Sequence, residues 1–239
     1  MSFTVVLVQP QTAGNVGAVC RLMKNFGVSD LVLLDPQCEL DDEARRRAKH
    51  AVDVLDASRR VATWDEAISG CELVVGSTAI RASERKVLRS HIGPRQLGER
   101  LAGAKGRAAL VLGREGEGLH TDELERCELV VTIPASPEYG TLNISQAAAV
   151  ILYEVWVGRQ LDAESFELAG AVEKEVILRS ADTLMDELAF SEQRAHKIGL
   201  VLRRVLAKSF LTRQEAFGLA GFFRVLVDRT GGRDTDGDR

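Results

Sequence analysis

Five short runs of apolar, largely β-branched residues constrain the fold of this chain more than any other feature. They are TVVLV (4–8), LVLL (31–34), LVVGS (73–77), AALVLG (108–113) and LVVTI (129–133). These runs lack a polar alternation, which is typical of strands that are buried on both faces. Helical patterns separate the runs at 16–26, 42–57, 94–102 and 121–124, and Thr121 is predicted to cap the last of these helices. The alternation predicts the α/β class, with a parallel sheet covered by helices on both faces.

The pattern changes after the fifth run, because only helical periodicity follows from Asn143 onward. We therefore predict an α/β domain over 1–161, an acidic linker over 162–170 and a small all-helical domain over 171–230. The helical domain contains three stretches, at 171–189, 192–208 and 212–229. The last nine residues, GGRDTDGDR, hold no apolar side chain, so the tail 231–239 is predicted to be disordered.

Composition excludes several classes of protein. The chain has 239 residues, of which 45% are hydrophobic and 28% charged, as in a globular protein and unlike a disordered or fibrous one. No run approaches the roughly 18 apolar residues of a membrane span, and the N-terminus does not look like a signal peptide. We expect a cytoplasmic protein that makes no membrane contact. The four cysteines form no CxxC pair, which predicts neither a metal site nor a disulfide framework.

Charge is distributed unevenly along the chain. The formal net charge is −4, yet residues 193–229 hold eight Lys or Arg against only Glu215 and Asp228. A basic stretch of this kind is either a solvated helix face or a surface for a polyanion such as RNA. The charge alone leaves both interpretations open.

Three segments follow predicted strands and carry unusual residues. The first, QPQTAGNVGAVCR, contains Gly14, Asn15 and Gly17; the second is GREGEGL (113–119), and the third is IPASPEYGTLNISQ (133–146). Ligands of an open parallel sheet bind beyond the carboxyl ends of its strands. Glycines permit a positive φ and a close approach of the backbone to a ligand. These segments are therefore the predicted ligand-binding edge.

Common nucleotide and hydrolase motifs do not fit these segments. The glycines at 113, 116 and 118 do not form GxGxxG, and they follow the fourth run, whereas the dinucleotide fingerprint follows the first strand. The chain has no GxxxxGK[ST] and no GxSxG motif. An NAD-dependent enzyme, a P-loop enzyme and a Ser-His-Asp hydrolase are all disfavoured.

Taken in order, the three segments resemble the three motifs of the SPOUT superfamily of RNA methyltransferases. They match as Asn15, Gly17 and Arg21, then LVLGREGEGL (110–119), then IPASPEYGTLNISQAAAV (133–150). The Pro-Glu-Tyr before Thr-Leu-Asn is most similar to the TrmJ branch of the TrmH/TrmJ family, tRNA 2′-O-methyltransferases that act on nucleotide 32 of the anticodon loop. Gly140 stands where other members often have Ser, and the GEG after GRE also departs from the common form.

The resemblance implies a fold and a cofactor. In this superfamily the loops after the last strands are threaded into a trefoil knot, a rare exception to unthreaded connections, and S-adenosylmethionine binds among their backbone groups. By motif matching, the residues expected to contact the cofactor are Ser77, Thr78, Ala79, Gly113, Glu115, Ile133, Gly140, Thr141 and Leu142. No metal is expected in the reaction.

Catalytic roles are also carried over from the motifs. Arg21 is expected to activate the ribose 2′-hydroxyl and to hold the adjacent phosphate, because an arginine is a poor general base. Asn15 is expected to orient Arg21 or the ribose, and Asn143 and Ser145 to hydrogen-bond the substrate. Glu115 is expected to partner Arg114 or another basic residue of the pocket. Asn143 is also predicted to cap the helix that follows it.

Partners follow from the same resemblance. The helix SQAAAVILYEVWVGRQL (145–161) is apolar nearly all round, so that it and its Trp156 are predicted to be buried on more than one side. Family members dimerise through this helix and the first one, which implies a homodimer. The residues expected to contact RNA are Arg114, Arg194, Lys197, Arg203, Arg204 and Lys208. The alternatives to a tRNA methyltransferase are an rRNA 2′-O-methyltransferase and a non-catalytic RNA- or cofactor-binding module.

Overall fold

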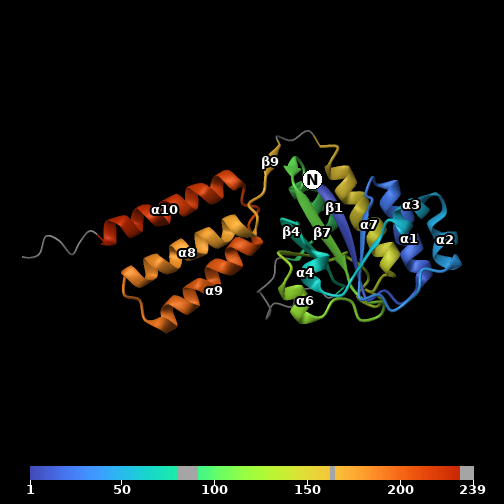
Figure 1. Ribbon diagram of the computed structural model, residues 1–239, viewed down its shortest axis with the longest axis horizontal. Helices are drawn as coiled ribbons and strands as arrows, with labels where there is room; N and C mark the ends of the chain where they lie inside the picture. The colour runs from blue at the N-terminus through green and yellow to red at the C-terminus, as the bar shows by residue number, and fades with distance from the viewer. Residues whose placement is uncertain (80–90, 162–164, 232–239) are drawn as a thin grey trace, which may run out of the picture. The chain divides into compact units, whose positions relative to one another are not determined.

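The computed structural model describes residues 1–79, 91–161 and 165–231 (Figure 1). The chain divides into two compact units, Met1–Phe166 and Glu167–Arg239. Most of the tail predicted to be disordered, 232–239, and part of the acidic linker, 162–164, lie outside the described residues. The two units are described separately below.

Unit 1 is built on a seven-stranded sheet whose paired strands are all parallel. The order is β3-β2-β1-β7-β4-β8-β5, with bounds β1 Ser2–Val8, β2 Asp30–Leu34, β3 Arg59–Val61, β4 Leu73–Ser77, β5 His91–Ile92, β7 Arg107–Leu112 and β8 Leu129–Val131. The five predicted runs are the five inner strands, and the α/β prediction is confirmed. Sequence analysis missed the edge strands β3 and β5, because β3 is mostly exposed and β5 has two residues.

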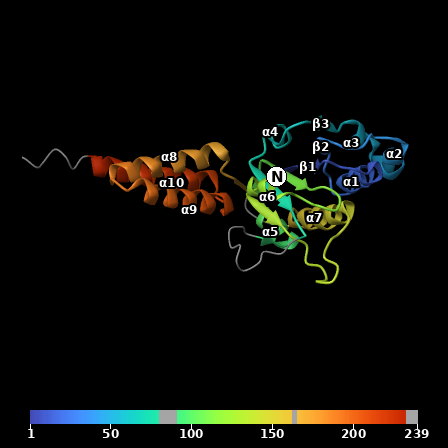
Figure 2. The same cartoon turned by 90° about the horizontal axis from the view of Figure 1, so that it is seen from below.

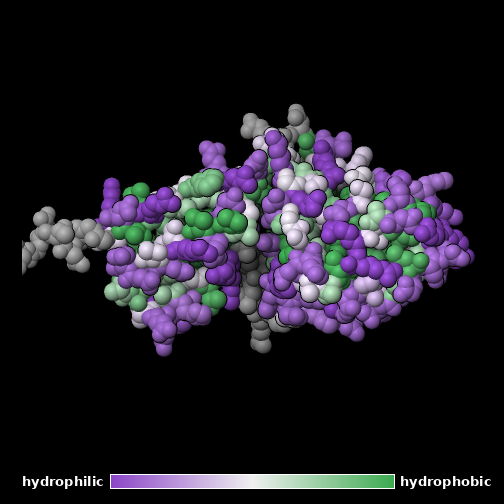
Figure 3. All heavy atoms as spheres, in the orientation of Figure 1, coloured by the Kyte–Doolittle hydropathy of each residue, from purple (hydrophilic) through white to green (hydrophobic). Residues whose placement is uncertain are grey.

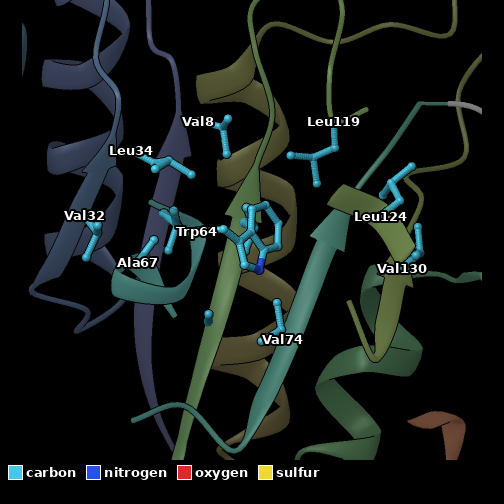
Figure 4. Packing of buried hydrophobic residues seen from close by; sticks show 12 residues of the cluster. Val8, Val32, Leu34, Trp64, Ala67, Val74, Leu119, Leu124 and Val130 are labelled. Atoms are coloured by element: carbon cyan, nitrogen blue, oxygen red, sulfur yellow. The ribbon is translucent and has the colours of Figure 1, made fainter. Parts of the chain in front are cut away.

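Helices cover the two faces of this sheet. The helix α7 (Ile144–Gly158) packs against α1 (Ala13–Asn25) and α5 (Pro94–Arg100) on one face. On the opposite face lies α4 (Trp64–Ala67) (Figure 2), and α6 (Thr121–Glu125) packs there through Leu124. On that opposite face the Trp64 side chain lies among Val8, Leu34 and Val74 (Figure 4). The alternate residues of each inner strand point to the α1, α5 and α7 side, as the pleat requires.

Two helical predictions need correction. The helix predicted over 42–57 is broken into α2 (Asp42–Ala48), a 3₁₀ turn η1 (Lys49–Ala51) and α3 (Val52–Asp56), because Lys49 has φ +54° in the left-handed region. The N-cap of α6 is His120 and not Thr121, since the Glu123 carboxylate accepts a 2.7 Å hydrogen bond from the His120 amide.

The α7 helix is less buried in this single chain than its composition predicted. Ile151, Leu152 and Val155 are buried, but the Trp156 side chain is 40% exposed and Tyr153 is 50% exposed. The prediction that Trp156 is buried is therefore wrong for one chain. The inner side of α7 is fixed by close packing on α5, where a Cβ added to Gly98 would lie 2.2 Å from the Glu154 carbonyl oxygen.

Unit 2 consists mainly of α8 (Ala171–Glu187), α9 (Glu192–Lys208) and α10 (Arg213–Gly231). Its core contains Ile177 and Leu178 from α8, Leu206 from α9, and Ala216 and Ala220 from α10. Two short strands, β6 (Ala104–Lys105) in unit 1 and β9 (Phe166–Glu167), complete the elements. No helix in the described part of the chain is long and apolar enough to cross a membrane.

Candidate active site at the carboxyl edge of the sheet

A cavity of about 460 Å³ opens at the carboxyl ends of β4, β7 and β8, beside the first turns of α7. All nine residues that the motifs predicted for the cofactor lie on its wall. They come from three loops, after β4, β7 and β8, that are far apart in sequence. The parallel sheet brings these loops together because the carboxyl ends of its strands share one edge.

Further residues on the wall were not predicted. Among them, Ile144, Ala147 and Ile151 recur at helical spacing and form the side of α7 that faces the cavity. Leu119, Tyr139 and Glu117 come from the same loops as the predicted residues. The helical spacing was visible in the sequence, but it does not distinguish a cavity wall from an ordinary core face.

The loop after β7 is a tight turn that needs its glycines. The Arg114 amide and carbonyl pair with those of Gly118, at 3.1 and 3.0 Å. A Cβ at Gly113 would lie 2.1 Å from the Gly118 carbonyl carbon, a distance that no side chain tolerates. Gly116 and Gly118 have φ of 89° and 74°, in the region that favours glycine. The glycines therefore let the backbone of this loop form part of the cavity wall.

Arg114 holds this loop in place. Its side chain is only 11% exposed, and its two terminal nitrogens donate to the Glu123 carboxylate at 2.9 Å each. Its Nε donates to Gln9 Oε1 at 2.5 Å. The hydrogen bonds to Glu123 raise the pKa of Arg114. This geometry gives Arg114 a role in fixing the loop, and its contact with RNA stays a prediction.

Gln9 connects the loop to the neighbouring strand end. Its Nε2 donates to Asp35 Oδ2 at 2.7 Å, so that the amide bridges a carboxylate on one side and the Arg114 guanidinium on the other. Gln9 and Asp35 directly follow β1 and β2, and both have φ near +45°, at 46° and 45°. Two neighbouring non-glycine residues in this region are strained, and such strain is found where surrounding structure holds a functional site in place.

Glu115 has a different partner from the one predicted. Its carboxylate accepts hydrogen bonds from the Thr12 amide at 3.1 Å and from Thr12 Oγ1 at 2.6 Å. The predicted pairing with Arg114 does not form, because Arg114 is taken by Glu123. Thr12 is the residue before α1, and thus Glu115 ties the start of α1 to the cavity loop.

Asn143 connects the other two motifs. Its Nδ2 donates to Asn15 Oδ1 at 3.2 Å, and its Oδ1 accepts from the Ser145 amide and hydroxyl at 2.8 and 2.7 Å. The predicted cap of α7 by Asn143 is confirmed. Asn15 thus orients Asn143, while Arg21 points to another side of α1, because side chains six residues apart on a helix point about 120° apart. Asn143 lies on the cavity wall, whereas Asn15 and Ser145 do not line the cavity.

Arg21 is exposed on α1 and does not line the cavity. Arg21 lies on the same side of α1 as Gly14 and Gly17, and this side packs toward α2. A Cβ at Gly17 would lie 2.0 Å from the Ala44 carbonyl oxygen. Within the described part of the chain, no hydrogen bond or ion pair involves Arg21, and its side chain is exposed to solvent.

The basic residues predicted in unit 2 gather on α9. Arg194, Lys197, Arg203 and Arg204 are all exposed. In Figure 3, polar residues (purple) alternate with apolar residues (green) over the surface of unit 2. Arg203 lies 4.0 Å from Glu175 and Arg194 stacks on Phe190 with its guanidinium carbon 4.6 Å from the ring centre. The side chain of Lys208 lies outside what the structure describes.

A parallel α/β sheet, a glycine-rich loop after β7 and a capped helix after β8 all face one cavity, which is the arrangement expected of a SPOUT methyltransferase. The model of the SpoU rRNA Methylase family matches residues 2–153. The chain belongs to this family.

Several known proteins resemble it over nearly its whole length. The tRNA (cytidine-2′-O-)-methyltransferase TrmJ of Methanocaldococcus jannaschii is 32% identical over 226 residues, covering 92% of this chain and 98% of the relative. The tRNA (cytidine/uridine/adenosine-2′-O-)-methyltransferase TrmJ of Pseudomonas aeruginosa is 37% identical over 238 residues, covering 91% and 90%. The crystal structure of TrmJ from Z. mobilis, 28% identical, superposes with a TM-score of 0.67 over 95% of this chain and 99% of that one.

A more distant structure shares the fold. The SpoU methyltransferase AviRb from Streptomyces viridochromogenes, solved in complex with the cofactor AdoMet, is 22% identical with a TM-score of 0.51 and covers 66% of this chain and 58% of that one. Within the described part of the chain, no group of three or more His, Cys, Asp or Glu could hold a metal ion.

Proposed function

We propose that the chain is an S-adenosylmethionine-dependent tRNA ribose 2′-O-methyltransferase. The observation that carries this proposal is that the nine residues matched to cofactor motifs, from three separate loops, line one cavity. The TrmJ relatives, matched over nearly their full length, are named as tRNA 2′-O-methyltransferases. The cavity of about 460 Å³ lies within the usual range for a small-molecule site.

The residues present suit S-adenosylmethionine. Leu119, Val131, Ile133 and Ile151 give the cavity apolar walls for an adenine ring, and the backbone of the loop after β7 offers polar groups at close range. Glu115 and Glu117 lie on the same wall, and their carboxylates attract a cation such as a sulfonium. The cofactor, when bound, supplies a methyl group already activated by positive sulfur.

The chain's own residues position the attacking ribose. Asn143 presents its amide at the cavity wall, held by Asn15 and Ser145, and it is proposed to hydrogen-bond the target ribose. Arg21 is proposed to hold the phosphate next to that ribose and thereby lower the free energy of hydroxyl ionisation. Its exposure and lack of a described partner support a contact with RNA.

The finer details of the substrate and assembly are also proposals. The target is proposed to be nucleotide 32 of the tRNA anticodon loop, carrying cytidine or uridine. The relatives differ in the nucleosides that their names include, so the accepted base is a property of each member. A tRNA substrate implies action in the cytoplasm. The trefoil knot that the family resemblance implies is proposed for the loops after β7 and β8.

A homodimer is proposed through α7. Val150, Tyr153 and Trp156 are exposed apolar side chains on this one helix, and Phe26 at the end of α1 packs edge-on against Tyr153 with ring centres 6.1 Å apart. A second copy would cover this apolar face. Light scattering on the intact protein tests the dimer, and a mass of one chain, 26.1 kDa, would contradict it.

The proposed function is tested by mass spectrometric mapping of ribose methylation. Purified protein, labelled cofactor and unmodified tRNA transcript should give one methylated ribose in the anticodon loop, in the presence of a metal chelator. Methylation of rRNA but not of tRNA would support the rRNA alternative. Cofactor binding by calorimetry without transfer to either RNA would indicate a non-catalytic module.

A further inference from the structure

Tyr139 is an aromatic side chain that the cavity presents to solvent. It lines the cavity, yet its side chain is 83% exposed, more than any other large hydrophobic side chain in the described part of the chain. A residue with both properties lies at the rim. A ring this exposed contributes little to folding, because it removes little apolar area from water.

The backbone beneath this ring is held in place. The Tyr139 amide donates to the Ser136 carbonyl at 3.2 Å, and the Glu138 amide donates to Ser136 Oγ at 3.3 Å. This turn lies in the loop between β8 and α7, which projects beyond the helices in Figure 2. The turn holds the backbone that carries the ring, and the described protein leaves the ring 83% exposed. Such an arrangement presents an aromatic face to a ligand.

The position of the ring limits what that ligand is. The next three residues, Gly140, Thr141 and Leu142, lie on the cavity wall, and Asn143 follows them. A ribose that is bound at Asn143 carries its base outward, toward the rim, because the 2′-hydroxyl must face the cofactor. A base in that place is unpaired and unstacked, and proteins bind such bases by stacking them on aromatic rings.

We propose that the Tyr139 ring stacks on the base of the nucleotide whose ribose receives the methyl group. This inference rests on the proposed function and adds the contact that holds the target nucleotide. Stacking needs only a flat π-face, and therefore it accepts different bases. The Tyr139 hydroxyl is not required for it.

The test compares Tyr139→Phe, Tyr139→Leu and Tyr139→Ala in the full-length protein. Tyr139→Phe should keep the wild-type KM for tRNA, whereas Tyr139→Leu and Tyr139→Ala should raise it by about 5- to 150-fold, the range expected when one base stack is removed. The Kd for S-adenosylmethionine should change far less than the KM for tRNA in all three, because the ring lies at the exposed rim of the cavity. A rise of the cofactor Kd in Tyr139→Ala as large as the rise of the KM would assign the ring to the cofactor and overturn the proposal.

An RNA that lacks the base of the target nucleotide tests whether this base is the one that stacks on Tyr139. An anticodon-arm RNA whose target nucleotide keeps its ribose but lacks its base should bind wild type and Tyr139→Ala equally, because the stack is already absent. An equal loss on the intact and the abasic RNA would show that the ring contacts another part of the substrate. Wild-type protein that methylates no tRNA would contradict the proposed function, whereas an active wild type with an equally active Tyr139→Ala would overturn only the stacking.

Discussion

At the scale of single residues, Arg21 offers the sharpest test of the proposed mechanism. It is exposed and does not line the cavity, so its removal should not affect cofactor binding. Arg21→Ala should lower methyl transfer by about 10²-fold or more, as expected for the loss of a positioning or proton-transfer group. Single-turnover assays with labelled cofactor, together with calorimetry of cofactor binding, measure the two effects.

The matched control is Arg46→Ala, since the Arg46 side chain is 70% exposed and lies 3.8 Å from Glu43. That variant should keep wild-type transfer. Unchanged turnover in Arg21→Ala would remove Arg21 from the site.

Glu123 makes part of the stability depend on pH. Burial raises its pKa, but the hydrogen bonds from Arg114 and from the His120 amide outweigh burial and leave the pKa below its ordinary value. A lowered pKa in the folded state stabilises the protein above the unfolded pKa, and this contribution is lost as the pH falls through the folded pKa. Glu123→Gln should therefore cost about 1–3 kcal/mol near neutral pH and progressively less in acid.

Thermal unfolding of wild type and variant between pH 7 and about pH 3 measures that difference. Glu117→Gln is the control for removing a carboxylate of the same loop, because the Glu117 side chain is 69% exposed and pairs with His120 instead of Arg114. A constant difference for Glu123→Gln across the range would contradict the assignment.

The motifs predicted which residues line the cavity but not how they are held. Gly113, Ile133 and Thr141 could be placed because each lies in a recognisable motif. The partners of Arg114 and Glu115 could not, since Gln9 and Thr12 are more than a hundred residues away in sequence. To predict that Arg114 pairs with Glu123 and not with Glu115, one must know how the loop bends, and the sequence alone does not fix that bend.

At the scale of elements, the packing of α5 on α7 depends on glycine. A Cβ at Gly98 would lie 2.2 Å from the Glu154 carbonyl oxygen, and a Cβ at Gly158 2.2 Å from the Gly98 carbonyl oxygen. Gly98→Ala should therefore force the helices apart and destabilise the protein by about 1–3 kcal/mol. Chemical denaturation measures the change.

Gly93→Ala provides the comparison. Gly93 immediately precedes α5 with φ −77°, and a Cβ there would meet nothing within 4 Å. It should leave stability nearly unchanged. Equal effects of the two substitutions would show that the contact between α5 and α7 is not what limits residue size at Gly98.

Sequence patterns predicted the buried strands and helices better than the exposed or short ones. The inner strands β1 and β7 carry long apolar runs because both of their faces meet helices. The edge strand β3 has the sequence RRV and α4 has only four residues, so neither has a period that sequence analysis can detect. The break at Lys49 is a single backbone angle, which no hydrophobic pattern predicts.

At the scale of the whole molecule, unit 2 is proposed to supply RNA affinity. Reversing Arg203 and Arg204 to Glu should weaken tRNA binding and lower its salt dependence by close to one unit of log-log slope for each phosphate that the variant no longer neutralises. Cofactor binding should persist, because the cavity lies in unit 1. Filter binding at several salt concentrations gives both values.

The control is the same reversal to Glu at Arg46 and Arg47, which are both exposed on α2 in unit 1. It distinguishes a direct contact of α9 with RNA from an effect of the net charge of the protein. An equal loss of tRNA affinity in the two double variants would show that only the net charge matters. Wild-type affinity and slope in a folded Arg203 and Arg204 variant would defeat the RNA-binding role of α9.

The order of the strands also has a consequence during synthesis on the ribosome. β1 pairs on one side with β2, but its other partner is β7, with Ser2 opposite Arg107. At about 5–20 residues per second, that edge of β1 stays open on the nascent chain for roughly 5–20 s before β7 is translated. An open, apolar strand edge is prone to pairing with other chains. Newly made protein should therefore depend on chaperones until residue 112 has left the exit tunnel.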